Sequence, residues 1–165
     1  MGNNSKTISL LGLAIWLMTC FVVAAVGASA SLQAGTFYAD LDRPDWAPPG
    51  AVFGPVWTML YTMMAVAAWV VWQRRENRLA QLGLVFFVVQ LILNALWSWL
   101  FFGWSQGALS FLDIVALWAL IVVTLVLFWR IRPLAGLLLV PYLAWVSFAS
   151  ALNFRIWQLN PSVLG

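Results

Sequence analysis

The longest stretch without a charged side chain, from Leu79 to Leu112, most constrains what this chain can fold into. A helix needs only about 20 apolar residues to cross the hydrocarbon of a bilayer, so this stretch is too long for one span. The cluster Gly103-Trp104-Ser105-Gln106-Gly107 is typical of a turn and divides it. Because a backbone in lipid must satisfy its own hydrogen bonds, the sequence predicts a membrane-spanning helix on each side of this turn.

Charged residues divide the rest of the chain in the same way. Of the 165 residues, 64% are hydrophobic, well above the roughly 45–50% of soluble domains. We therefore expect an all-α integral membrane protein, a five-transmembrane-helix bundle that forms a single domain. The predicted helices cover residues 8–30, 51–73, 79–102, 107–129 and 133–158, and the loop 31–50 is expected to cap the bundle.

The first apolar run has two interpretations. Lys6, the run itself and Ala28-Ser29-Ala30 are similar to a signal peptide with its cleavage site. The run is longer than the 7–15 residues typical of the apolar part of such a peptide, which favours a retained helix. Its small residues Ala24, Gly27, Ala28 and Ser31 suit close packing against another helix.

Basic residues predict the orientation in the membrane. Five helices place the two termini on opposite sides, and the side with more Lys and Arg is usually cytoplasmic. One side would carry Lys6, Arg74, Arg75, Arg78, Arg130 and Arg132, and the other would carry Arg43 and Arg155. We expect a cytoplasmic N-terminus, with the C-terminus and the first loop outside. The absence of an organelle signal favours a bacterial inner membrane.

The residue counts exclude several classes of function. The chain has no histidine, which removes the usual haem ligand and the usual general base, and no metal site is expected. Its net charge is only +3, without a basic run, so nucleic-acid binding is not expected. No acid–base or nucleophile constellation indicates an enzyme.

Aromatic and amide side chains share faces on three predicted helices. The three faces are Trp57, Tyr61 and Met64; Gln90, Asn94, Trp97 and Phe101; and Tyr142, Trp145, Ala149, Leu152 and Asn153. Such stripes are common in ordinary helix packing, and they also suit the walls of a ligand pocket. The high tryptophan count, 12 residues, favours the pocket because a belt at the membrane surface accounts for only some of them.

Asp113 is the one acidic residue within a predicted span. A charged aspartate near a helix centre costs about 2.5–3.5 kcal/mol, so its side chain should face the bundle or a cavity. Two roles stay open, a structural hydrogen bond between helices and a ligand or proton role.

The first loop is stiff and acidic. Residues 42–50 read DRPDWAPPG, where three prolines fix the backbone and remove hydrogen-bond donors. A stiff segment with Trp46 at the mouth of a bundle suits a lid over a pocket or a structural cover over the helix ends.

Three groups of motifs resemble one known family. They are Gly35-Thr36-Phe37-Tyr38 with residues 41–49 and Gly54-Pro55-Val56-Trp57; residues 93–97, 101–103 and Asp113; and residues 141–145, 148–149 and 152–154. In sequence and spacing they resemble the translocator protein family, also called TspO/MBR or tryptophan-rich sensory proteins. The resemblance covers nearly the whole chain.

The resemblance implies a five-helix homodimer with a pocket under the first loop. Such a pocket would take tetrapyrroles such as protoporphyrin IX and isoquinoline or benzodiazepine ligands, with no cofactor required. By position, Tyr38 and Trp145 match the pair linked to light-dependent porphyrin breakdown, at most a slow photo-oxidation. The predicted ligand-binding residues are Trp46, Trp57, Tyr61, Asn94, Trp97, Asp113, Tyr142, Trp145, Ala149 and Leu152.

Two further expectations follow. The family's cholesterol motif has a tyrosine where this chain has Phe154 before Arg155, so cholesterol recognition is not expected. The predicted function is a membrane receptor or scavenger for tetrapyrroles and other apolar ligands. The alternative is a small-molecule or tetrapyrrole transporter, although the sequence shows no internal repeat of the kind common in transporters.

Overall fold

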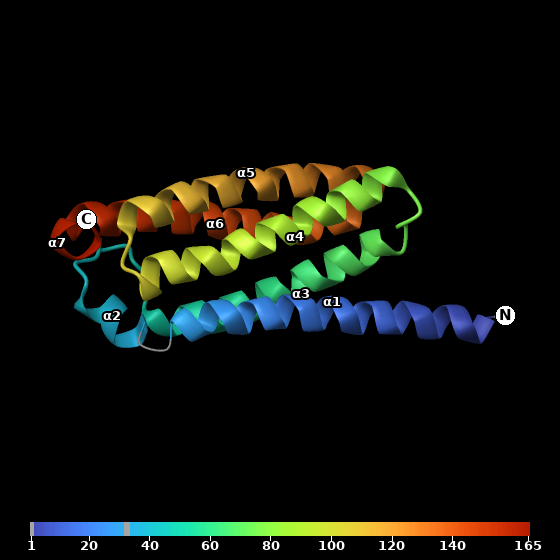
Figure 1. Cartoon of the computed structure of the whole chain (residues 1–165), viewed down its shortest axis with the longest axis horizontal. Helices are drawn as coiled ribbons and strands as arrows, with labels where there is room; N and C mark the ends of the chain where they lie inside the picture. The colour runs from blue at the N-terminus through green and yellow to red at the C-terminus, as the bar shows by residue number, and fades with distance from the viewer. Residues whose placement is uncertain (1, 32–33) are drawn as a thin grey trace.

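The computed structural model describes residues 2–31 and 34–165, with side chains from residues 7–31 and 36–165, and over these ranges it is helical (Figure 1). Its elements are α1 (Gly2–Ala30), α2 (Ala34–Asp40), η1 (Gly50–Val52), α3 (Phe53–Trp72), α4 (Arg78–Ser98), η2 (Trp99–Gly103), α5 (Gly107–Ile131), α6 (Pro133–Leu159) and α7 (Pro161–Leu164). Five helical segments are long and apolar enough to cross a membrane. The predicted all-α, five-helix membrane architecture is confirmed.

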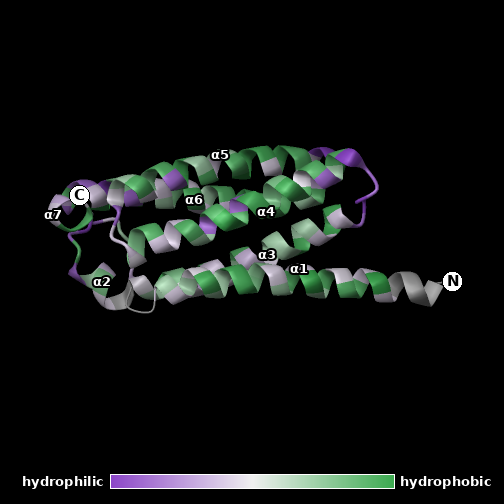
Figure 2. Ribbon diagram, viewed as in Figure 1, coloured by the Kyte–Doolittle hydropathy of each residue, from purple (hydrophilic) through white to green (hydrophobic). Residues whose placement is uncertain are grey.

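The membrane-crossing segments run side by side along the long axis of the molecule. They are Thr7–Ala30, Gly50–Trp72, Arg78–Gly103, Gly107–Ile131 and Pro133–Leu159. The two termini lie at opposite ends of the bundle, and the turn between α3 and α4 lies at the same end as the N-terminus (Figure 1). Figure 2 shows hydrophilic residues gathered in this turn and at the start of the next helix, with apolar residues between the two ends.

The segment 31–50 differs from the predicted loop. Residues Ala34–Asp40 form helix α2, so the expectation of a loop throughout is wrong for this part. The first proline of the segment comes only at Pro44, which leaves α2 free to form. Tyr38 and Leu41 are both buried, so α2 is anchored by apolar contacts. Residues 42–49 are non-helical, as their prolines predict.

Contacts between the helices fix the layout of the bundle. Helix α5 packs between α4 and α6, α3 packs on α1 and α6, and α1 also reaches α4. The approach of α1 to α3 is close, because a side chain at Gly12 would overlap the ring of Trp72. The indole Nε1 of Trp69 donates to the carbonyl of Ser9 at 2.8 Å and ties the same two helices together.

The predicted turn after the third span begins with a wider helical turn. Residues Trp99–Gly103 form a π-helical turn, closed by the amide of Trp104 donating to the carbonyl of Trp99 at 2.8 Å. Ser105 then takes a positive φ of 52°. The predicted break at residues 103–107 is confirmed, and the π turn shifts the aromatic residues before it relative to a regular helix.

Candidate functional site

A cavity of about 520 Å³ lies between α1, α3 and α4, at the end of the bundle that carries α2. Its volume falls in the range of small-molecule sites, about 300–1,000 Å³. The lining residues are Phe21, Ala24, Ala25, Gly27, Ala28, Ser31, Tyr38, Gly50, Phe53, Gly54, Trp57, Thr58, Tyr61, Asn94, Trp97, Ser98 and Phe102. The cavity is thus apolar and aromatic, with a few hydroxyls and one amide.

A chain of buried hydrogen bonds fixes the polar part of this wall. Tyr61 on α3 donates its hydroxyl to Oδ1 of Asn94 at 2.7 Å. Nδ2 of Asn94 donates to the hydroxyl of Tyr142 at 2.8 Å, and that hydroxyl donates to Oε1 of Gln90 at 2.7 Å. Three helices are joined in this way, and the face shared by Gln90 and Asn94 is the one that the sequence predicts.

Two tryptophans give the cavity flat walls. The ring of Trp97 stacks on Phe101 with centroids 5.6 Å apart, and its Nε1 donates to Oδ1 of Asn153 at 2.8 Å. The ring of Trp57 lies 5.6 Å from Tyr61 and 6.3 Å from Tyr142. Both tryptophans are only partly buried, so part of each ring is free to contact a ligand.

Tyr38 of α2 lines the cavity at the end of the bundle that carries α2. Its hydroxyl donates to the carbonyl of Pro48 at 3.1 Å, which joins α2 to the proline-rich segment. The guanidinium carbon of Arg43 lies 4.9 Å from the centre of its ring. Burial raises the pKa of the Tyr38 phenol, and the positive charge of Arg43 acts in the opposite direction.

The α1 wall is the part of the site that sequence reasoning missed. Ala24, Gly27, Ala28 and Ser31 line the cavity together with Phe21. The sequence does mark this surface, since its small residues predict close packing against another helix. At Gly27 the packing is indeed close, since a Cβ there would lie 3.1 Å from the hydroxyl of Ser98.

The structure brings together five of the predicted site residues around the cavity: Tyr38, Trp57, Tyr61, Asn94 and Trp97. The other six do not line it: Trp46, Asp113, Tyr142, Trp145, Ala149 and Leu152. Tyr142 lies directly behind the wall, bonded to Asn94. Ala149 and Leu152 are buried among neighbouring side chains. A ligand role for these six residues stays a prediction.

Trp145 lies one ring away from the cavity. Its ring centroid is 5.8 Å from that of Phe53, which itself lies 5.5 Å from the ring of Tyr38. On its other side Trp145 meets Phe148 at 5.6 Å, and Phe148 meets Trp46 at 5.7 Å. Its Nε1 is buried without a hydrogen-bond partner in the described part of the chain.

Asp113 is half-buried on α5. Its Oδ2 is enclosed and has no hydrogen-bond partner among residues 7–31 and 36–165. Oδ2 therefore does not form the structural hydrogen bond between helices that is one of the two roles the sequence suggests for Asp113. A buried acceptor without a donor suits a bound proton, water or ligand group.

Comparison with known proteins identifies the family. The sequence model of the TspO/MBR family matches residues 12–158. The chain belongs to the TspO/MBR family. It is 43% identical over 154 residues to Protein CrtK of Rhodobacter capsulatus, an alignment that covers 93% of this chain and 95% of that protein.

Two other relatives show the breadth of the similarity. The tryptophan-rich protein TspO of Chlorobaculum tepidum is 44% identical over 157 residues, covering 92% of this chain and 98% of that protein. The human translocator protein is 38% identical over 128 residues and 75% of each chain. With its five apolar helices, this TspO/MBR protein is an integral multi-pass membrane protein with a receptor or transporter role.

Proposed function

We propose that this TspO/MBR protein is a receptor or scavenger that binds tetrapyrroles of the protoporphyrin IX kind, and smaller isoquinoline- or benzodiazepine-type ligands, in the cavity under α2. The observation that supports the proposal is the pair of partly free indole rings, Trp57 and Trp97, on a cavity of about 520 Å³. A flat apolar macrocycle gains most from such aromatic faces, and a few fixed polar groups orient it.

The polar ends of a porphyrin also find suitable partners. Its two propionates would lie at the mouth, where Arg43 is exposed over Tyr38. Its apolar face would lie against Phe53 and the α1 wall. Because the chain contains no histidine, a metal-free tetrapyrrole fits better than a haem.

The proposal extends to slow light-dependent oxidation of the bound porphyrin, with dissolved dioxygen as the oxidant that takes up the electrons. Tyr38 borders the cavity, and Trp145 lies behind Phe53, which touches both rings. Both side chains can be oxidised in one-electron steps, so the photo-excited porphyrin would take an electron from Tyr38 or Trp145 and pass it to dioxygen, which becomes superoxide. The side-chain radical would then recover an electron from the porphyrin, which is oxidised by one electron overall. Loss of porphyrin absorbance under light, slowed in Tyr38→Phe and in Trp145→Phe, would support this step.

A titration in the dark tests binding first. Protoporphyrin IX is added to the purified protein in detergent, and quenching of tryptophan fluorescence is followed for wild type and Trp57→Phe. Trp118→Phe is the matched control, because Trp118 bonds to Ser147 on the α5–α6 side and does not line the cavity. We expect saturable quenching in wild type and control, and binding weaker by up to about tenfold in Trp57→Phe, because the phenyl ring offers the porphyrin a smaller aromatic face than the indole.

The alternative outcomes are distinct. Quenching that never saturates, or that is equal in all three proteins, would mean that the porphyrin partitions into the micelle and would reject the proposal. Net porphyrin flux into sealed proteoliposomes, absent in empty vesicles, would favour the transporter.

We also propose a bacterial inner-membrane location with the N-terminus in the cytoplasm, and a homodimer. Support for the orientation comes from the arginines at the N-terminal end of the bundle, Arg74, Arg75, Arg78, Arg130 and Arg132. Asn77→Cys and Ser162→Cys, each with Cys20→Ser, are treated in intact cells with a membrane-impermeant thiol reagent. Labelling of position 162 alone is expected, and labelling of position 77 alone would reverse the orientation.

Light scattering of the purified protein tests the dimer.

A further inference from the structure

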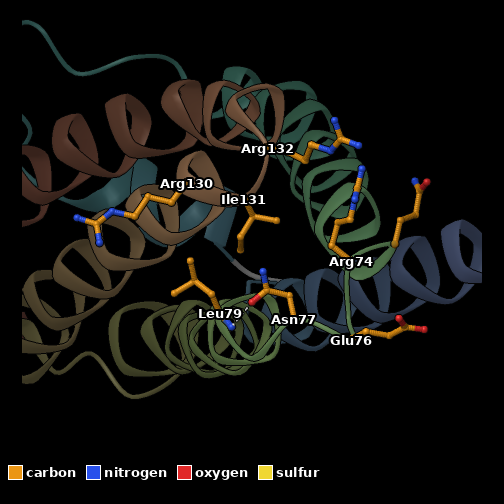
Figure 3. Close-up of a pocket in the computed structure, with 8 residues that line it drawn as sticks. Arg74, Glu76, Asn77, Leu79, Arg130, Ile131 and Arg132 are labelled. Carbon is orange, nitrogen blue, oxygen red and sulfur yellow. Dashed lines mark hydrogen bonds between the residues drawn. The ribbon is translucent and has the colours of Figure 1, made fainter.

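Two adjoining hollows lie at the opposite end of the bundle from the cavity, where α3 ends and α6 begins. Each has a volume of about 570 Å³ and opens to the surface. Both are lined by Gln73, Arg74 and Arg132. Figure 3 shows the first, with the guanidinium groups of Arg74 and Arg132 extending toward the same region and Arg130 pointing to the other side.

The charge of this region is not neutralised. No ion pair or hydrogen bond involves the guanidinium of Arg74 or Arg132 within the described residues. Neighbouring Arg75 is different, because its guanidinium lies 4.1 Å from the ring of Trp72 and donates to that residue's carbonyl. The acid in the first hollow, Glu76, points away from both guanidinium groups in Figure 3 and does not line the second hollow.

The backbone that carries these arginines is well anchored. Arg132 is the single extended residue between α5 and α6, and its carbonyl accepts from the amide of Ala135 at 2.9 Å. On the other side, the amide of Arg74 donates to Val71 at 2.8 Å and its carbonyl accepts from Asn77 at 2.9 Å. Two guanidinium groups on anchored backbone thus border the same two hollows, an arrangement that favours an anion.

The second hollow is apolar on its membrane side. Besides Gln73 and the two arginines it is lined by Val70, Pro133 and Leu134. Leu134 is 59% exposed and Leu137, one turn deeper along α6, is 55% exposed. Since α3 ends at Trp72 and α6 begins at Pro133, we expect the arginines at the membrane–water boundary and Leu137, one turn into α6, at the depth of acyl chains.

We propose that Arg74 and Arg132 bind the phosphate of an anionic phospholipid, whose acyl chain lies along Leu134 and Leu137. Guanidinium groups bind phosphate oxygens through paired, charge-assisted hydrogen bonds, and basic pockets between membrane helices suit anionic headgroups. A zwitterionic lipid would bring its ammonium group toward two guanidinium groups, so it should bind more weakly. The site is remote from the proposed tetrapyrrole cavity and does not depend on it.

The test is a thermal-stability titration of the purified full chain in detergent. Phosphatidylglycerol, phosphatidylcholine with the same acyl chains, and inorganic phosphate are added separately. We expect a saturable rise in Tm with phosphatidylglycerol alone. The half-saturating concentration should rise about tenfold or more in Arg74→Gln/Arg132→Gln, as loss of charge-assisted bonds predicts. Arg75→Gln and Arg155→Gln are the matched controls and should respond as wild type.

Two further variants separate the headgroup from the acyl chain. Arg74→Lys/Arg132→Lys keeps both charges and should retain most of the response to phosphatidylglycerol. If the double glutamine variant does not fold, Leu134→Ser and this lysine variant still test the site. Leu134→Ser keeps the arginines and should weaken phosphatidylglycerol binding. Equal responses to both lipids, an equal response to inorganic phosphate, or an equal loss in Arg75→Gln would each overturn the proposal.

Discussion

The side-chain amide of Asn160 holds both backbone groups of Asp42. Its Oδ1 accepts from the Asp42 amide at 2.9 Å, and its Nδ2 donates to the Asp42 carbonyl at 2.8 Å, although the two residues are 118 positions apart. Nδ2 also donates to the carbonyl of Ile156, at the end of α6. Asn160 is buried, so these bonds are shielded from water and fix the start of the proline-rich cap to the last long helix.

Replacing Asn160 by alanine should release the cap. Asn160→Ala removes both bonds to Asp42, so the backbone amide and carbonyl of Asp42 lose these partners. We expect the unfolding free energy to fall by about 1–3 kcal/mol. Hydrogen exchange measured by mass spectrometry should become faster in peptides covering residues 41–50. Gln158→Ala is the control, because Gln158 is exposed and its side chain accepts from Arg155, away from Asp42. Unchanged exchange in Asn160→Ala would show that the prolines alone hold the cap.

The ionisation of Tyr38 should report on the same cap. Burial raises its pKa above the usual value of about 10, so the folded state favours the neutral phenol. The corresponding stabilisation is present below about pH 10 and is lost as the pH rises through the higher folded pKa. Tyrosinate absorbance of wild type minus Tyr38→Phe isolates this titration.

Arg43 provides a check on that titration. Because its charge lowers the pKa of Tyr38, Arg43→Gln should move the difference titration to higher pH. A titration at or below the usual tyrosine range in both proteins would contradict the buried position of the phenol.

The spans could be predicted because lipid permits few alternatives. Charged residues such as Arg74 and Arg132 divide the chain between spans, and helical periodicity places Asn94 and Trp97 on one face, as the structure has them. Helix α2 was missed because it is only seven residues long, too short to show a periodic pattern. The hydrogen bonds between Asn160 and Asp42 could not be predicted for another reason. The sequence around either residue contains no pattern that indicates a contact 118 positions away.

The site was predictable to a similar extent. Aromatic faces on α3 and α4 predicted two walls of the cavity, but the third wall, formed by α1, was not predicted. Small residues on α1, such as Ala24 and Gly27, have the same pattern whether they pack against a helix or border a void. The place of Trp145 behind Phe53 depends on how rings of different helices meet, which the spacing within one helix does not determine.

The hydrogen bonds of Asn94 should show as coupling between residues. Asn94→Leu removes the acceptor of the Tyr61 hydroxyl and one of the two hydrogen bonds of the Tyr142 hydroxyl, which still donates to Gln90. We expect a loss of about 1–2 kcal/mol of unfolding free energy. Combined with Tyr61→Phe, the loss should be smaller than the sum of the single losses, because both changes remove the same 2.7 Å bond. Unfolding in mixed micelles followed by circular dichroism measures this.

Thr62→Val is the control for this cycle. It removes an exposed bond within α3, from the Thr62 hydroxyl to the carbonyl of Thr58, and should add to Asn94→Leu without coupling. Full additivity of Asn94→Leu with Tyr61→Phe would mean that the buried bond contributes little to stability.

Two helical glycines, Gly136 and Gly54, should respond differently to substitution by alanine. A Cβ at Gly136 would lie 2.8 Å from the Cβ of Trp129 and 2.9 Å from its Cα, closer than real contacts permit. Because a backbone atom of α5 is among these neighbours, rotation of the tryptophan side chain cannot relieve the overlap, and α6 would have to shift. Gly136→Ala should therefore lower the unfolding free energy by about 1–3 kcal/mol.

Gly54→Ala is the matched comparison on α3. A Cβ there meets no atom within 4 Å, so only the helix preference of alanine over glycine acts, which favours the folded state by up to about 1 kcal/mol. Thermal unfolding of the two variants in the same detergent should move Tm down for Gly136→Ala and leave it unchanged or raised for Gly54→Ala. A Tm for Gly136→Ala equal to that of wild type would mean that α5 and α6 are not packed as closely as Trp129 and Gly136 indicate.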